Sequence, residues 1–271
     1  MSTKQIGFIG AGNMANALIK GLINSDSYHA DQITASDNDD KKLALLSDLY
    51  RIDPFKANKD LVQNSDIIIL SVKPQVIRTV LEEIRDVVRD DHLIISIAAG
   101  IPVRMILSII GRDVPVIRVM PNTPALIQKG ISALAPAEMA TEGNIVSAQE
   151  IFNSVGNTVV VNEDMMDAVT ALSGSGPGYV FKIMESFVEA GEKQGFDNKT
   201  ALQLTIQTFL GAASLASQSE LSLTKLREMV ASPGGTTAAG LSAMEDMGLD
   251  SVIETTVDAA CKRSVELGKN Y

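Results

Sequence analysis

Up to about residue 161, short apolar runs alternate with segments whose apolar residues recur at helical spacing. Because these runs are apolar on both faces and helical segments separate them, we expect a parallel sheet with helices on both sides. The predicted strands are the run that ends at Ile9 and residues 33–36, 67–72, 93–97, 116–120 and 158–161. The predicted helices are residues 14–24, 39–49, 75–88, 103–110 and 140–154.

Beyond Asn162 the pattern changes to helices alone, and Asn162-Glu163-Asp164 is typical of a helix start. The predicted breaks between these helices are residues 174–178, 195–198, 217–222 and 232–235. Several of the helices are apolar over more than one face. One small domain cannot bury that much apolar helix surface, so a partner subunit is expected. The sequence therefore predicts an α/β domain over residues 1–161 and an all-helical dimerisation domain over residues 162–271.

A glycine motif follows the first predicted strand directly. Gly10-Ala11-Gly12-Asn13-Met14-Ala15 has the pattern G-x-G-x-x-A and leads into a predicted helix. Gly10 permits a sharp turn, Gly12 lets backbone N–H groups approach a pyrophosphate, and Ala15 lets the helix pack closely on the strand. Because the strand and the helix are both present, the motif predicts a dinucleotide-binding domain of the Rossmann type, doubly wound, over residues 1–161. A purely structural glycine turn is the alternative.

Four further segments follow strands at the edge of the sheet where ligands bind. Ser36 and Asp37 stand at the end of the second predicted strand. In a dinucleotide fold, an acidic residue there accepts hydrogen bonds from the ribose hydroxyls and repels a 2′-phosphate. The alternative is that Asp37 caps the helix that begins at Asp39. Small residues in 71–74 and 97–100 leave room for a flat cofactor, or serve tight packing. The turn 121–124 places Asn122 between two prolines, near the expected nicotinamide position.

Two glycine-rich segments lie in the helical half. Residues 172–179 place three glycines and a proline inside a helical pattern, which requires a reason such as close approach by a ligand or a second subunit. Residues 231–237 read Ala-Ser-Pro-Gly-Gly-Thr-Thr, and consecutive N–H groups entering a helix there suit a carboxylate. A plain Pro-Gly turn with a threonine N-cap is the alternative.

Composition excludes several functional classes. The net charge is −10 and no stretch is dense in Lys or Arg, which argues against nucleic acid or an anionic membrane as partner. No signal peptide or membrane-spanning run is expected, and the single cysteine, Cys261, is interpreted as a small core residue, so we expect a cytoplasmic protein. His29 and His92 lie beside aspartates and are interpreted as solvated. Since no metal cluster or Cys/His or Ser/His nucleophile pair can be assembled, a cofactor is expected to supply the reactivity.

These motifs occur in the order and spacing of pyrroline-5-carboxylate reductases, which the chain resembles over essentially its whole length. The motifs are the glycine motif, Val72-Lys73-Pro74, Pro121-Asn122-Thr123-Pro124, Leu172-Ser-Gly-Ser-Gly-Pro177, and Ser232-Pro-Gly-Gly235 with Thr237. The resemblance implies reduction of 1-pyrroline-5-carboxylate to proline by NADPH or NADH, the last step of proline synthesis. It also implies a helical domain that intertwines into a homodimer; dimers of this family often assemble into larger rings.

The resemblance also implies roles for individual residues. The 232–237 loop would hold the substrate carboxylate and place Thr237 beside the ring nitrogen as the catalytic residue, and Glu220 matches a family glutamate near the substrate, although an exposed helix-end residue is an equal alternative. The other expected substrate-binding residues are Ser232, Gly234, Gly235 and Thr236. The expected cofactor-binding residues are Gly10, Ala11, Gly12, Asn13, Met14, Ser36, Asp37, Asn58, Val72, Lys73, Pro74, Ala98, Ala99 and Asn122. No metal ligand is expected.

Two features leave alternatives. Asp37 stands where members that favour NADPH tend to carry a small hydroxyl or a basic neighbour, which leaves the choice between NADPH and NADH open. Lys182 imitates the catalytic lysine of β-hydroxyacid dehydrogenases, but Glu185 on the same helical face favours its charged form and Ser186 replaces the expected asparagine. Lys182 is therefore interpreted as a solvated or interface residue. A non-catalytic dinucleotide-binding sensor is the remaining alternative.

Overall fold

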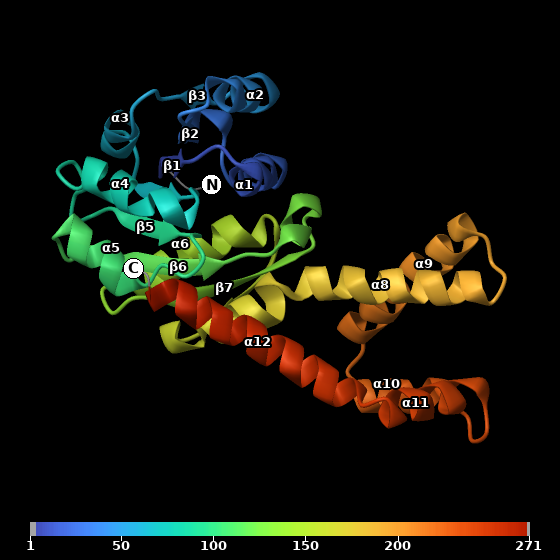
Figure 1. The fold of residues 1–271 in the computed structure, drawn as a ribbon. Helices are drawn as coiled ribbons and strands as arrows, with labels where there is room; N and C mark the ends of the chain where they lie inside the picture. Colours follow the sequence, from blue (N-terminus) through green and yellow to red (C-terminus); the bar gives the residue numbers. More distant parts are fainter. Residues whose placement is uncertain (1–3, 270–271) are drawn as a thin grey trace. The chain divides into compact units, whose positions relative to one another are not determined.

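The computed structural model describes residues 4–269, and Figure 1 shows their secondary structure. The chain divides into two compact units: one runs to Ser175 and resumes at Ala259, and the other is Gly176–Asp258. The last strand, β8 (Gly156–Val160), ends just before the boundary at 161/162 expected from the sequence. The two units instead part after Ser175, and again within the last helix. The domain boundary itself stays a prediction.

The first unit contains one sheet whose strand order is β3-β2-β1-β4-β5-β6-β7-β8. All neighbouring strands are parallel except β6 and β7, which are antiparallel. The remaining strands are β1 (Ile6–Ile9), β2 (Ile33–Ser36), β3 (Asp53–Pro54), β4 (Ile67–Leu70), β5 (Leu93–Ser96), β6 (Val116–Met120) and β7 (Gly130–Pro136). The order 3-2-1-4-5-6 is that of a dinucleotide-binding sheet, and the predicted fold class is confirmed.

Helices cover both faces of this sheet, because successive side chains of a strand point to opposite sides. Ile69 of β4 belongs to a core with α1 (Asn13–Asn24), α2 (Asp40–Tyr50) and α6 (Glu142–Asn153). Its neighbour Ile68 belongs to a second core with α3 (Asn58–Gln63), α4 (Pro74–Ile84) and α5 (Val103–Ile110). The strands are therefore buried on both faces, as their continuous apolar pattern predicts.

Two strands and one α-helix were absent from the sequence-based assignment. β3 is only two residues long and contains a proline at the edge of the sheet, a position where the missing N–H is tolerated. β7 reads Gly-Ile-Ser-Ala-Leu-Ala-Pro, with one β-branched residue, and forms because β6 and β8 pair with it on both sides. α3 has six residues, too few for a visible helical period.

The predicted break at residues 174–178 is helical apart from a bend at Ser175, so this expectation was wrong. A 3-10 turn η3 (Glu163–Met165) and a short helix α7 (Met166–Val169) lead into a π turn, η4 (Thr170–Gly174), and the helix α8 (Gly176–Lys193) begins after Ser175. Pro177 is the second residue of α8, where its missing N–H would have no helical partner in any case.

The second unit is built from helices. They are α8, α9 (Asn198–Gln218), α10 (Leu223–Val230), α11 (Thr236–Asp246) and the first part of α12 (Leu249–Lys269). Phe187 and Phe209 join α8 to α9 edge to face, with ring centroids 5.3 Å apart. Only Val188, Ala201 and Thr205 are buried among the residues of this unit, whereas large apolar side chains such as Met247 lie exposed. Such a unit has too small a core of its own, which agrees with the expected partner subunit.

Two single-residue interpretations need correction. His92 is fully buried before β5; its Nδ1 accepts the Arg89 N–H at 3.0 Å, and its Nε2 has no hydrogen-bond partner within residues 4–269. Burial, reinforced by the charge of Arg89, lowers the pKa of His92. Asp91 beside it is exposed, but His92 is buried together with the apolar strand that begins at Leu93. Cys261 is half-buried on α12 rather than part of the core.

No helix in residues 4–269 is both long enough and apolar enough to cross a membrane.

Candidate functional site

The glycine motif forms the tight turn between β1 and α1. Gly10 has φ +103°, and a Cβ there would lie 2.7 Å from the carbonyl oxygen of Ser71. The Gly10 N–H donates to the Ser36 carbonyl at 2.7 Å, which ties the turn to the end of β2. Only glycine fits this position, because its conformation is left-handed and the neighbouring backbone is close.

Gly12 differs from Gly10 because a side chain at Gly12 would not clash with any neighbouring protein atom. A Cβ built at Gly12 would meet nothing within 4 Å. Gly12 is the N-cap of α1, which has no side-chain cap and no acidic residue in its first turn. An open cradle at an uncapped helix N-terminus fits a phosphate group, which would occupy the space that a side chain would fill.

Asp37 stands beside this cradle, with its side chain 16% exposed. Its Oδ2 accepts the Ala11 N–H at 2.8 Å and its Oδ1 accepts the Asp39 N–H at 2.9 Å. The Lys42 ammonium lies 3.8 Å from Oδ2. The cap of α2 is Asp39, which accepts the Lys41 N–H at 3.0 Å, so the alternative of Asp37 as helix cap does not hold.

A cavity of about 380 Å³ lies against these loops. Seven of the expected cofactor-binding residues line it, namely Gly10, Gly12, Ser36, Asp37, Asn58, Val72 and Lys73. The sequence-based set did not include eight further lining residues: Ile9, Asn38, Lys42, Ser71, Val76, Thr79, Val80 and Glu83. Val76, Thr79, Val80 and Glu83 have the spacing i, i+3, i+4, i+7 on α4, so the helical period, continued from Lys73, would have found this wall.

The other expected cofactor residues lie outside the lining of this cavity. Ala11, Asn13 and Met14 belong to the glycine turn and α1, and Pro74 begins α4. Ala98 is buried and Ala99 exposed after β5. Asn122 uses its amide on the backbone: Oδ1 accepts the Ile131 N–H at 3.0 Å and Nδ2 donates to the Ser173 carbonyl at 3.2 Å. The cofactor roles of these residues stay predictions.

In the second unit, the 232–237 loop joins α10 to α11. Gly234 has φ +68°, and the Gly235 N–H donates to the Ser232 carbonyl at 2.9 Å. Gly235 is the N-cap of α11 and supplies no side-chain cap, so the alternative of a threonine N-cap is wrong. Thr236 and Thr237 are the first two residues of the helix; Thr236 is exposed and Thr237 half-buried. The loop therefore presents a glycine turn, an uncapped helix start and a threonine hydroxyl together.

The two remaining expectations of the second unit concern charged residues. Glu220 is exposed between α9 and α10, and its substrate role stays a prediction. Lys182 pairs with Glu185 at 3.2 Å, and both side chains are about two-thirds exposed. An exposed lysine held by a carboxylate lacks the burial that a proton-transferring lysine needs. This agrees with its interpretation as a surface residue.

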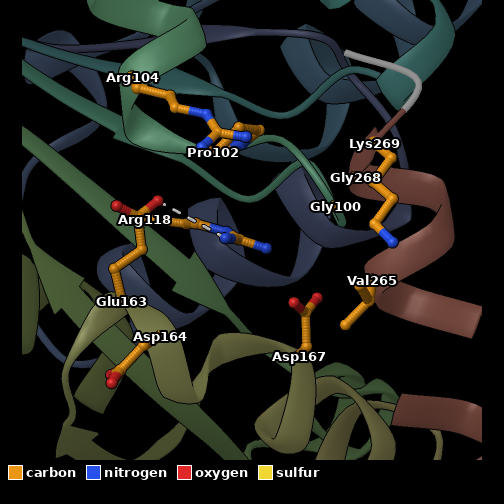
Figure 2. A pocket seen from close by; sticks show the side chains of 10 residues that line it. All are labelled: Gly100, Pro102, Arg104, Arg118, Glu163, Asp164, Asp167, Val265, Gly268 and Lys269. Atoms are coloured by element: carbon orange, nitrogen blue, oxygen red, sulfur yellow. Dashed lines mark ion pairs between the residues drawn. The ribbon is translucent and has the colours of Figure 1, made fainter. Parts of the chain in front are cut away.

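A second cavity of about 380 Å³ in the first unit combines acidic and basic side chains (Figure 2). The buried Arg118 of β6 lies 3.6 Å from Glu163, which also accepts the Val103 N–H at 2.7 Å. Asp167 accepts the Ser264 hydroxyl at 2.6 Å, which attaches the end of α12. These contacts hold η3, α7 and the last turns of α12 on the sheet. Within residues 4–269, no group of three or more His, Cys, Asp or Glu side chains is arranged to hold a metal ion.

Comparison with known proteins agrees with both units. Residues 163–267 match the family model described as "Pyrroline-5-carboxylate reductase dimerisation", and residues 5–100 match the model described as "NADP oxidoreductase coenzyme F420-dependent". The first match supports a homodimer formed through the helical part of the chain.

Full-length relatives are similar throughout. The pyrroline-5-carboxylate reductase of Pseudomonas aeruginosa is 40% identical over 270 residues, which cover 99% of this chain and 98% of that protein. A solved pyrroline-5-carboxylate reductase from Coxiella burnetii is 36% identical, with a TM-score of 0.94 and coverage of 98% and 99%. A Plasmodium falciparum pyrroline carboxylate reductase, solved with NADP bound, is 29% identical, with a TM-score of 0.87 and 99% of each chain covered. With its glycine cradle, its helical second unit and this similarity over the full length, the chain belongs to the pyrroline-5-carboxylate reductase family.

Proposed function

We propose that this chain reduces 1-pyrroline-5-carboxylate to L-proline with NADPH or NADH. The uncapped start of α1 at Gly12, in the wall of the cavity, carries the proposal, because a phosphate bound there would occupy the open space beside Gly12 and accept the free N–H groups. The family membership supports the substrate, and the solved relative with NADP bound supports the class of cofactor.

The residues around the cavity fit a dinucleotide. The uncapped N–H groups at the start of α1 bind the pyrophosphate, and Asp37 accepts hydrogen bonds from the ribose hydroxyls. Lys42 and Lys73 balance the charge of Asp37 and of the phosphates. When bound, the reduced nicotinamide supplies the hydride that the imine carbon accepts.

The substrate needs little acid–base assistance from the protein. A cyclic imine has a substantial protonated fraction near neutral pH, and the carbon of the protonated imine accepts a hydride without a strong general acid. We assign the carboxylate of the substrate to the 232–237 loop, and its ring nitrogen to the Thr237 hydroxyl. Ser232, Gly234, Gly235 and Thr236 complete this loop, and Glu220 is assigned to the edge of the same site.

The assembly follows from the second unit. Its exposed apolar side chains, among them Phe181, Leu210 and Met229, are covered when two chains associate. We further propose that such dimers assemble into a larger ring. Light scattering tests this directly, because the measured mass of a ring is a multiple of the dimer mass. Because the chain has one cysteine and so no internal disulfide, we also propose a reducing cytoplasm as its location.

Product analysis tests the proposed reaction. The purified chain is incubated with 1-pyrroline-5-carboxylate and reduced cofactor, and the products are identified by mass spectrometry. The proposal expects proline and oxidised cofactor in equal amounts. Cofactor oxidation without proline would overturn it in favour of another reduction.

A further inference from the structure

Glu83 of α4 lines the cofactor cavity and forms the end of a short chain of hydrogen bonds. Its Oε2 accepts Nδ2–H of Asn58 at 2.8 Å. The Oδ1 of the same Asn58 accepts the hydroxyl hydrogen of Ser36 at 2.7 Å. Ser36 is 1% exposed, and all three side chains line the cavity. The chain thus links α4, the first residue of α3 and the end of β2.

The carboxylate at the end of this chain gives it a direction. An ionised carboxylate only accepts hydrogen bonds, whereas a serine hydroxyl both donates and accepts. Facing Glu83, the Asn58 amide must turn its nitrogen to the carboxylate and its oxygen to Ser36. Without Glu83, the amide could flip, because Ser36 is able to bond either end.

We propose that Glu83 is a positioning residue for the cofactor, because it fixes the orientation of the Asn58 amide in the cavity wall. One N–H of Asn58 is used by Glu83, and the second remains for a hydroxyl or ring nitrogen of the adenosine half. A flipped amide would present its oxygen there instead, and an acceptor such as a ring nitrogen would then face another acceptor. The inference rests on the proposed function, because it takes the cavity to be the cofactor site.

The neighbouring Glu82 provides a matched control. It lies on the same turn of α4, is exposed, and pairs with Arg78 at 4.0 Å rather than lining the cavity. Replacing Glu82 with Leu removes the same charge and makes the same change of side chain without touching the Asn58 amide.

The test compares Glu83→Leu, Glu83→Gln and Asn58→Ala, measured by fluorescence titration of NADPH and NADH and by steady-state kinetics. Glu83→Leu keeps the size of the side chain but cannot accept, so we expect Kd and KM for the cofactor to rise roughly 5–20-fold. The value of kcat should stay within about twofold, because the change lies at the adenosine end. Glu83→Gln can both donate and accept, so it does not fix the direction of the Asn58 amide, and its cofactor affinity should lie between those of wild type and Glu83→Leu. Glu82→Leu should match wild type.

A double-mutant cycle separates positioning from packing. If Glu83 acts through Asn58, Glu83→Leu should weaken cofactor binding less than twofold further in the Asn58→Ala background. Full additivity would overturn the proposal. If Glu83→Leu lowers Tm strongly, the same cycle is run with Glu83→Gln: this change should weaken cofactor binding no further in the Asn58→Ala background, and an undiminished further loss would overturn the proposal. Wild-type protein that binds neither cofactor would instead contradict the proposed function.

Discussion

The carboxylate of Asp37 accepts the backbone N–H of Ala11 at 2.8 Å, which joins the end of β2 to the glycine turn. Its negative charge therefore lies on the wall of the proposed cofactor cavity, where we expect the ribose of the adenosine half. Lys42, 3.8 Å away, offsets this charge only in part because its side chain is half exposed.

This geometry predicts the effect of Asp37→Ser on cofactor choice. A serine can still accept the Ala11 N–H but does not repel a 2′-phosphate, so kcat/KM for NADPH relative to NADH should rise roughly tenfold. Asp40→Ser, which removes an exposed acid from the first turn of α2, is the control and should leave the ratio unchanged. An unchanged ratio in Asp37→Ser would mean that the ribose lies elsewhere.

The two glycines of the motif should respond differently to alanine. Gly12→Ala meets no protein atom, so Tm should stay near wild type while the Kd for NADPH and NADH rises roughly tenfold or more. Gly10→Ala must adopt φ +103° against the Ser71 carbonyl, so it should lower the free energy of unfolding by about 1–3 kcal/mol. Thermal unfolding and cofactor titration measure the two effects. Equal loss of stability in both variants would contradict the cradle at Gly12.

His92 should make stability depend on pH. Burial lowers its pKa in the folded state below the ordinary value of 6.5, so at acid pH the unfolded chain binds a proton before the folded chain does. The free energy of unfolding should therefore be constant with respect to this group above pH 6.5 and fall as the pH drops below it. Arg89 opposes the protonated imidazole, while Asp66 and Asp91 favour it, and the net direction is a lowered pKa.

Denaturant unfolding between pH 7 and pH 5 measures this effect. His92→Asn keeps an acceptor for the Arg89 N–H and cannot titrate, so its stability should fall less over this range than that of wild type. The exposed His29 is the control, because His29→Asn preserves a good N-cap and should follow the wild-type curve. If His92→Asn follows it too, another group causes the acid sensitivity.

Thr237 should matter for the imine and not for the cofactor. Thr237→Ala removes one hydroxyl hydrogen bond, which should lower kcat/KM for pyrroline-5-carboxylate roughly 10–100-fold with the Kd for the cofactor unchanged. Thr237→Ser should recover most of the loss.

Lys182 should not take part in the reaction. Turnover of Lys182→Met should remain within a few-fold of wild type, because Lys182 is an exposed residue paired with Glu185. A thousandfold loss in folded Lys182→Met would favour the dehydrogenase alternative.

The sequence predicted those parts of the fold that depend on local pattern. The strands, the glycine turn and Asp37 follow from apolar runs and from positions directly after them. The sequence-based set ended at Pro74 and so left out Glu83, which the helical period continued from Lys73 reaches. β7 was missed because its neighbours rather than its own residues stabilise it. The burial of His92 was missed because the aspartate beside it is exposed, whereas the imidazole lies in the core at the start of β5.

Steady-state turnover tests the central claim most directly. Purified protein is mixed with 1-pyrroline-5-carboxylate and either NADPH or NADH, and oxidation of the cofactor is followed by absorbance. We expect saturable turnover that requires the imine with at least one of the two cofactors. Gly12→Val, whose side chain would fill the cradle, should abolish this turnover. No turnover with either cofactor, from folded and dimeric protein, would contradict the account.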